Sequence, residues 1–266
     1  MLRTRIVTAI IAIPILIWLI LYASAAAYNF VVLLCTFISL REMAAMQRNM
    51  INGGTLLTAG AGMVIAISML IDPTGQAVSA GIVVALVGIL LGTLATATNM
   101  QRSVVGAGQI LFAALYGGLL LPHLIWLRAQ PEGPRLVFFL LACVMASDAG
   151  GYFGGRAFGR RKLWPSVSPN KTVEGAVSSV VAAVLVGTIF DQVLVERFGP
   201  IEVVFVAAVI SMLGQVGDLA ESMIKRAYEA KDSGWILPGH GGVLDRTDSM
   251  VLPIVFTYYY AVWSVG

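Results

Sequence analysis

The stretch "RLVFFLLACVMASDAGGYFGG", residues 135–155, carries a formal charge only at Arg135 and Asp148. A membrane-spanning helix needs roughly 20 largely apolar residues, so this stretch predicts one such helix. A carboxylate inside a membrane span is costly, and an ionisable residue there is by default a functional hypothesis. We therefore expect Asp148 to be either paired or used in the chemistry of the protein.

The composition of the whole chain agrees with a membrane protein. Of its 266 residues, 58% are hydrophobic and 12% are charged, and the mean hydropathy is +0.87. A soluble domain is usually about 25% charged, so an ordinary soluble domain is excluded. Cys35 and Cys143 both lie in apolar runs, which indicates neither a disulfide framework nor a metal site.

Hydropathy predicts an all-α, polytopic integral membrane protein with about nine transmembrane helices. The first apolar run is too long for a secretory signal peptide, and more spans follow it, so we interpret it as a retained helix. The predicted spans lie near residues 5–23, 27–46, 55–72, 76–97, 104–127, 135–155, 173–194, 201–224 and 246–264.

The basic residues predict how these helices are oriented, because cytoplasmic loops carry an excess of Lys and Arg. If the N-terminus is cytoplasmic and the spans alternate, only Arg128, Arg135 and Arg197 lie outside, and the other 14 of the 17 Lys and Arg lie inside. One helix more or fewer in the middle would spoil this partition. We therefore predict a cytoplasmic N-terminus and a C-terminus on the outside.

The chain divides into two parts by its polar content. Residues 1–133 contain about five helices, which we expect to shape a cavity and to offer a dimer contact. Residues 134–266 form the predicted catalytic region, with two polar cytoplasmic segments at 147–175 and 218–249. The outside loops carry no comparable cluster, so any chemistry is expected at the cytoplasmic face.

Two pairs of carboxylates predict a metal site. Asp218 shares a face of the eighth helix with Glu221 at i+3 and Ser222 at i+4. Asp245 and Asp248 are spaced i, i+3 at the start of the ninth helix. If the two helices are adjacent and antiparallel, Asp218 and Asp245 lie at similar depth, where carboxylates repel unless a cation separates them. Such oxygen ligands suit Mg²⁺. The alternatives are a structural Asp218 and capping acids in the ninth helix.

The turn "PGHGGVLD", residues 238–245, predicts an anion site, because glycines allow a close backbone approach and N–H groups before a helix bind phosphate. His240 is a phosphate donor, an acid/base group or a plain loop residue. Ser168, Lys171 and Thr172 are donors near the start of the seventh helix, although Ser168 and Thr172 could instead cap it. The cations beside the turn are Lys225, Arg226, Lys231 and Arg246.

These residues form a recognisable pattern. The stretch "SMIKRAYEAKDSGWILPGHGGVLDRTDS", residues 222–249, resembles the signature of CDP-diacylglycerol synthases, also called phosphatidate cytidylyltransferases. The upstream stretch "SDAGGYFGGRAFGRRKLWPSVSPNKTVEG", residues 147–175, resembles a second block of that family, with Gly151 where members often carry alanine. The matching signature positions are Ser222, Lys225, Arg226, Lys231, Asp232, Pro238, His240, Gly241, Gly242, Asp245, Arg246 and Asp248.

The resemblance implies that CTP and phosphatidate react to give CDP-diacylglycerol and pyrophosphate, with Mg²⁺ and a second cation such as K⁺. It also implies a homodimer in the inner (plasma) membrane, with an active site that faces the cytoplasm, contacts membrane lipid and binds no nucleic acid. The implied catalytic residues are Asp218, Asp245, Lys225, Arg226 and His240. The implied substrate-binding residues are Asp148, Ser168, Lys171, Thr172, Ser222, Lys231, Gly241, Gly242 and Arg246. The implied metal ligands are Asp218, Asp245 and Asp248.

Three other functions remain compatible with parts of the sequence. A CTP-dependent kinase or cytidylyltransferase acting on another membrane lipid, such as a polyprenol, would use a similar site. An ion-coupled transporter would also place Asp148 and Asp218 within glycine-rich helices. The polar residues gather on one side, however, which favours an interfacial enzyme over a path through the membrane. A structural scaffold would leave both polar segments unexplained.

Overall fold

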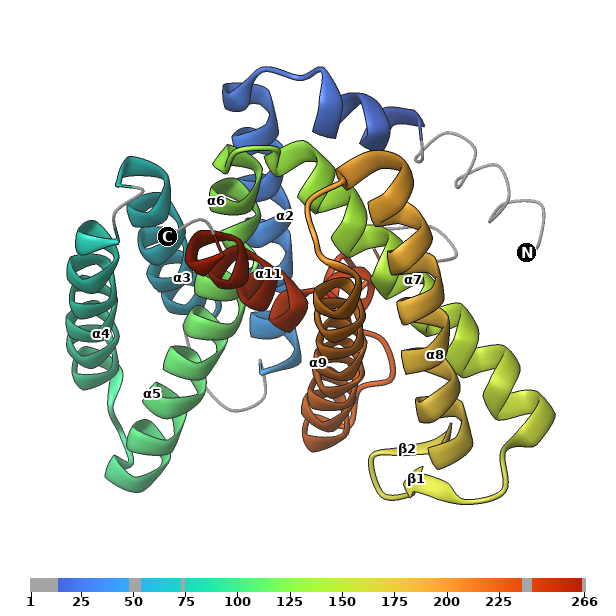
Figure 1. The fold of residues 1–266 in the computed structure, drawn as a ribbon. Helices are drawn as coiled ribbons and strands as arrows, with labels where there is room; N and C mark the ends of the chain where they lie inside the picture. The colour runs from blue at the N-terminus through green and yellow to red at the C-terminus, as the bar shows by residue number, and fades with distance from the viewer. Residues whose placement is uncertain (1–13, 48–53, 73–74, 236–240, 265–266) are drawn as a thin grey trace. The chain divides into compact units, whose positions relative to one another are not determined.

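The computed structural model describes residues 14–47, 54–72, 75–235 and 241–264. Seven helical segments in this part of the chain are long and apolar enough to cross a membrane. They coincide with seven of the nine predicted spans and confirm an all-α, polytopic architecture (Figure 1). The seven segments are Ala25–Met46, Gly54–Ile71, Gln76–Thr96, Met100–Ala129, Gly133–Phe158, Val173–Val195 and Pro200–Ala227.

The first and ninth predicted spans stay predictions, and so does the orientation of the termini. Only residues 14–21 of the first span are described as helical. The last helix, α11 (Val251–Trp263), has 13 residues. At 1.5 Å per residue it is about 20 Å long, which is shorter than the hydrocarbon core of roughly 30 Å.

The chain forms two compact units. Unit 1 contains the chain up to Trp126 together with Tyr228–Arg246, and unit 2 contains Leu127–Ala227 together with Thr247–Gly266. The polar stretch that follows the eighth predicted span therefore belongs with the N-terminal helices. The predicted boundary at residue 133 concerned function, and it stays a prediction.

Unit 1 is built from α2 (Ala25–Met46), α3 (Gly54–Ile71), α4 (Gln76–Thr96) and α5 (Met100–Leu115). The chain continues through the π-helix η1 (Tyr116–Leu120) into α6 (His123–Ala129). Small and β-branched side chains from α3, α4 and α5 fill its core, as expected where membrane helices associate by close packing. The buried members of this core are Ala61, Ile65, Ala85, Ile89, Ile110 and Ala114.

Unit 2 is built around α7 (Gly133–Phe158), α8 (Val173–Phe190) and α9 (Pro200–Ala227), with the π-helix η2 (Asp191–Val195) after α8. Buried hydroxyl groups join the three long helices: Ser147 and Ser211 share a hydrogen bond of 2.8 Å, and Ser179 donates to the Ser147 carbonyl oxygen at 2.8 Å. Such bonds satisfy polar groups between apolar helices and fix their register.

A short β-hairpin connects α7 and α8, and the all-α expectation did not include it. Strand β1 (Lys162–Trp164) pairs antiparallel with β2 (Ser168–Thr172). Thr172 then caps α8, since its Oγ1 accepts a hydrogen bond from the Gly175 N–H at 3.1 Å. The hairpin lies at the start of α8 in Figure 1.

The helix predicted over residues 246–264 is split into α10 (Leu244–Thr247) and α11 (Val251–Trp263), which corrects the expected continuous helix. Pro253 gives the physical reason. Proline has no N–H to donate to the carbonyl of residue 249, and its ring clashes with that carbonyl in a helix. Residues 248–250 consequently form a turn, and Asp248 lies in this turn and not within a helix.

Candidate functional site

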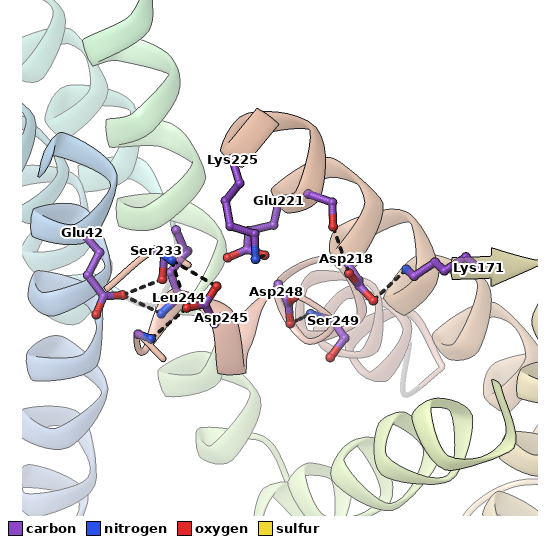
Figure 2. A network of polar contacts seen from close by, with 12 residues as sticks. Glu42, Lys171, Asp218, Glu221, Lys225, Ser233, Leu244, Asp245, Asp248 and Ser249 are labelled. Carbon is purple, nitrogen blue, oxygen red and sulfur yellow. Dashed lines mark hydrogen bonds and ion pairs between the residues drawn. The ribbon is translucent and has the colours of Figure 1, made fainter. Parts of the chain in front are cut away.

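Several predicted site residues lie in two polar clusters together with neighbours that were not predicted, one cluster in each unit. We call the first the loop cluster, which consists of Glu42, Ser233, Gly242, Val243, Leu244 and Asp245 in unit 1. We call the second the helix cluster, which consists of Lys171, Asp218, Glu221, Lys225 and Asp248 in unit 2. Figure 2 shows both groups.

In the loop cluster, backbone N–H groups hold the Asp245 carboxylate. The Ser233 N–H donates to its two oxygens at 3.2 and 3.0 Å, and the Gly242 N–H donates at 2.8 Å. Asp245 lies in the first turn of α10, where a negative charge is favoured. The hydrogen bonds from Ser233 and Gly242, which both precede α10, orient the carboxylate.

Glu42 on α2 is a member of this cluster that the sequence reasoning missed. Its carboxylate accepts hydrogen bonds from the Val243 N–H at 3.0 Å, from the Leu244 N–H at 2.8 Å and from the Ser233 hydroxyl at 3.2 Å (Figure 2). A usable signal was present, because Glu42 is an acid inside the predicted span 27–46. The rule that singled out Asp148 applies equally to Glu42.

In the helix cluster, Asp218 on α9 faces Lys171 on β2. The Lys171 ammonium lies 2.6 Å from Asp218 Oδ2, and the Ser222 hydroxyl donates to Asp218 Oδ1 at 3.4 Å. The expected shared face of Asp218 and Ser222 is confirmed. The hairpin therefore has a role in this site, because β2 carries the cation that accompanies Asp218 (Figure 2).

One turn further along α9, Glu221 and Lys225 form a second ion pair, with 2.5 Å between Lys225 Nζ and Glu221 Oε2. The Glu221 side chain has no exposed surface. Burying a charge is costly unless an opposite charge accompanies it, so Lys225 compensates a carboxylate that solvent does not reach.

Asp248 brings a further carboxyl group to this cluster. Burial raises the pKa of Asp248 to about 6, and the neighbouring Asp218 carboxylate adds to the rise. The Ser249 N–H, which donates to Asp248 Oδ1 at 2.7 Å, acts in the opposite direction. Like charges held together in this way favour binding of a proton or a cation.

The turn that carries Asp248 packs closely on α9. A Cβ on Gly217 would overlap the Asp248 carbonyl oxygen, and a Cβ on Gly214 would lie 3.0 Å from the Ser249 carbonyl oxygen. Glycines at these two positions let the turn approach α9 next to Asp218. Asp148 on α7 joins the same neighbourhood, because the Ser249 hydroxyl donates to its Oδ2 at 3.4 Å.

The carboxyl groups fit Mg²⁺ by their chemistry. No set of three His, Cys, Asp or Glu side chains among the described residues already converges on a metal position. Mg²⁺ does not require such a set, because it commonly binds one or two protein carboxylates together with waters and substrate phosphates. Burial and the neighbouring Asp218 carboxylate raise the pKa of Asp248, and a bound cation would relieve the repulsion between the two carboxylates.

The remaining predicted residues have less specific surroundings. Gly241 has φ of +81°, a conformation that favours glycine, and Gly242 is buried against Ser233 and Glu42. Ser168 lies on β2. Three of the predicted basic site residues have exposed side chains: Arg226, Lys231 and Arg246. His240 lies outside the described residues. Asp218 and Asp245 belong to different units, and their predicted pairing stays a prediction.

Comparison with known proteins gives a consistent result. The model of the cytidylyltransferase family matches residues 3–263. The chain is 36% identical to a phosphatidate cytidylyltransferase of Brucella suis over 262 residues, which cover 97% of this chain and 93% of the relative. It is 34% identical to one of Staphylococcus epidermidis over 258 residues, 95% and 97% of the two chains. A match to one of Bacillus subtilis is 42% identical over 153 residues, 57% of each chain.

Proposed function

Because this chain belongs to the cytidylyltransferase family, we propose that it is a phosphatidate cytidylyltransferase, which converts CTP and phosphatidate to CDP-diacylglycerol and pyrophosphate. The observation that carries the proposal is the similarity to phosphatidate cytidylyltransferases over nearly the whole chain. Four residues of the resembling signature belong to the two clusters, Gly242 and Asp245 to the loop cluster and Lys225 and Asp248 to the helix cluster. The carboxylates and cations of these clusters suit a nucleoside triphosphate with its metal ion.

In this reaction a phosphate oxygen of phosphatidate attacks the α-phosphorus of CTP, and the bond from that phosphorus to the pyrophosphate oxygen breaks. Phosphoryl-type transfers depend mainly on positioning and on neutralising charge. Lys171 and Lys225 are held in place by the carboxylates of Asp218 and Glu221. Their ammonium groups supply positive charge beside the proposed phosphate positions.

Asp218, Asp245 and Asp248 would hold Mg²⁺, which supplies charge neutralisation for the triphosphate and the leaving pyrophosphate. The loop cluster supports this role, because its hydrogen bonds fix the direction of the Asp245 carboxylate. Exposed Arg226, Lys231 and Arg246 then bind phosphate oxygens, and a second cation such as K⁺ completes the site.

The site faces the cytoplasm in this proposal, and the protein lies in the inner (plasma) membrane as a homodimer. The excess of basic residues in the predicted cytoplasmic segments supports the orientation. The reaction itself also favours an interfacial site, because a soluble nucleotide and an embedded lipid have to meet at the membrane surface. The homodimer rests on the family resemblance alone.

The test is conversion of labelled CTP to CDP-diacylglycerol by the purified protein in detergent, with phosphatidate and Mg²⁺. We expect activity in the parent and in Asp72→Asn, a control outside both clusters whose carboxylate accepts from the Ala77 N–H at 2.9 Å. If the parent does not turn over phosphatidate but consumes CTP in the presence of a polyprenol, the lipid substrate is a polyprenol and the proposal is contradicted. Net ion uptake by vesicles without CTP turnover would support the transporter instead.

A further inference from the structure

We propose that Glu42 is a positioning residue for this reaction: its buried carboxylate holds the Ser233 hydroxyl and the Val243 and Leu244 N–H groups, and thereby orients Asp245, whose donors lie on the same two segments. The catalytic consequence rests on the proposed function, whereas the structural part stands without it. Glu42 lies on α2, in the part of the chain for which the sequence indicated only a cavity wall or a dimer contact.

The buried Glu42 carboxylate holds the start of α10 in place through hydrogen bonds. The residue is only 4% exposed. Oε1 accepts from the Val243 N–H at 3.0 Å, and Oε2 accepts from the Leu244 N–H at 2.8 Å and the Ser233 hydroxyl at 3.2 Å. The amides of Val243 and Leu244 are at the start of α10, where N–H groups have no partner within the helix. Glu42 therefore caps α10 from another helix.

A carboxylate is required at this position, because each of its two oxygens accepts from a backbone N–H, which can only donate. An amide would place an NH₂ group against one backbone N–H, so that two donors would face each other. A buried donor without an acceptor costs more than the hydrogen bond it replaced. Glutamine is therefore a nearly isosteric change that removes the function.

The backbone around Glu42 is shaped to its carboxylate. A Cβ on Gly234 would lie 2.5 Å from Glu42 Oε1, and a Cβ on Gly242 would lie 2.5 Å from Glu42 Oε2. Side chains at either position would displace the carboxylate. Gly242 is one of the substrate-binding residues that the resemblance implies, and this packing gives it a second reason to be glycine.

Glu42 and Asp245 hold the same two backbone segments. Ser233 donates its N–H to Asp245 and its hydroxyl to Glu42. Gly242 donates its N–H to Asp245, while the next residue, Val243, donates to Glu42. Figure 2 shows the hydrogen bonds that join the Glu42 and Asp245 carboxylates to these residues. A shift of either segment away from Glu42 therefore moves the donors that orient Asp245.

The test compares Glu42→Gln with the parent and with Glu202→Gln. Glu202 is a matched control, since its carboxylate accepts from the Tyr260 hydroxyl and the Gly199 N–H in unit 2, among residues without a proposed catalytic role. Hydrogen exchange of the Gly242, Val243 and Leu244 amides reports the structural part. The kcat, the KM values and the Mg²⁺ concentration for half-maximal activity report the catalytic part.

In Glu42→Gln we expect faster exchange at the three amides, with α7, α8 and α9 unchanged. Groups that orient metal ligands typically contribute about 10–100-fold, so kcat should fall and the half-maximal Mg²⁺ concentration should rise by about tenfold or more. The KM for phosphatidate should change less than kcat. Glu42→Asp, which keeps the charge on a shorter side chain, should recover part of both effects.

Unchanged exchange at the three amides, or an unchanged Mg²⁺ dependence in a folded variant, overturns the proposal. An equal rise of exchange in both units also overturns it, because Glu42 would then be a general stability residue. If Glu42→Gln does not fold, Ser233→Ala takes its place, because it removes the hydroxyl that donates to Glu42. It must then increase amide exchange and the Mg²⁺ requirement in the same direction but to a smaller extent. A parent without activity would reject the proposed function and leave the exchange result to decide the structural part.

Discussion

The loop cluster and the helix cluster hold carboxylates in different ways. Asp245 and Glu42 in the loop cluster accept hydrogen bonds from backbone N–H groups and one hydroxyl. Asp218 and Glu221 in the helix cluster face lysine ammonium groups. The backbone N–H groups of the loop cluster fix the direction of each carboxylate, because the backbone is rigid. The lysines of the helix cluster balance the negative charge of each carboxylate, and their flexible side chains can turn from a carboxylate to a substrate phosphate. A site for a metal and a polyphosphate needs both properties.

The largest expected effect is the loss of activity in Asp218→Asn. The variant keeps the shape of the side chain and removes its charge, so it weakens the proposed Mg²⁺ site and releases Lys171. A loss of about 4 kcal/mol of transition-state stabilisation corresponds to about a 10³-fold lower kcat/KM. The labelled-CTP assay measures this, and a loss of less than about tenfold would remove Asp218 from the metal site.

The second effect concerns stability and separates the two clusters. Lys225→Met removes the cation from the fully buried Glu221, and breaking a buried ion pair costs about 3–5 kcal/mol. Ser233→Ala in the loop cluster removes one hydrogen bond, at about 1 kcal/mol. Equilibrium unfolding in mixed micelles measures both. The double variant Lys225→Met/Glu221→Leu should regain most of the lost stability, and equal losses in the single and double variants would refute the role of the pair.

The third effect concerns the close packing of the Asp248 turn. Gly217→Ala places a methyl group against the Asp248 carbonyl oxygen, and overpacking of this kind costs about 1–3 kcal/mol. The turn should move away from α9, and activity should fall by more than the lost stability accounts for. Gly108→Ala is the control, because a Cβ there meets nothing within 4 Å. Equal activity of the two alanine variants would show that the packing is unimportant.

The smallest effect is a pH dependence of metal binding. Burial and the nearby Asp218 raise the pKa of Asp248 to about 6. Mg²⁺ binds the ionised carboxylate, so protons compete with the metal below this pKa and not above it. Between pH 7 and pH 5, the Mg²⁺ concentration for half-maximal activity should rise by about tenfold. Asp248→Asn should flatten this dependence, and a parent with the same Mg²⁺ requirement at both pH values would contradict it.

The raised pKa of Asp248 has the opposite effect on the folding stability of the metal-free protein, which should be higher at acidic pH than at neutral pH. The folded pKa of Asp248 lies above its ordinary value of 3.8, so the folded state binds the proton more tightly than the unfolded state does. The resulting stabilisation is present at acidic pH and is lost as the pH rises through about 6. Added Mg²⁺ should restore stability at neutral pH, which unfolding measurements with and without the metal can detect.

The sequence predicted the features that depend on local composition. Seven spans could be located because uninterrupted apolar runs of about 20 residues are typical of membrane-spanning helices. The shared face of Asp218 and Ser222 followed from helical periodicity. The break before α11 was not predicted, although Pro253, which cannot donate to the carbonyl of residue 249, was a signal for it.

Contacts between distant parts of the chain could not be predicted in this way. Glu42 lies 201 residues from Val243, whose N–H donates to it, and no periodicity connects the two. Lys171 was expected as a donor near the start of the seventh helix, but its pairing with Asp218 depends on the β-hairpin. That hairpin contains two prolines, Pro165 and Pro169, which usually argue against strands.

The most direct test is binding of Mn²⁺, as a spectroscopic substitute for Mg²⁺, to the purified protein with CTP. We expect the parent and Asp72→Asn to bind Mn²⁺ equally. Asp218→Asn and Asp245→Asn should each weaken binding by about tenfold or more, because one carboxylate from each cluster serves the metal in the proposed site. Undiminished Mn²⁺ binding in either folded variant would contradict the proposal that both clusters contribute to one metal site.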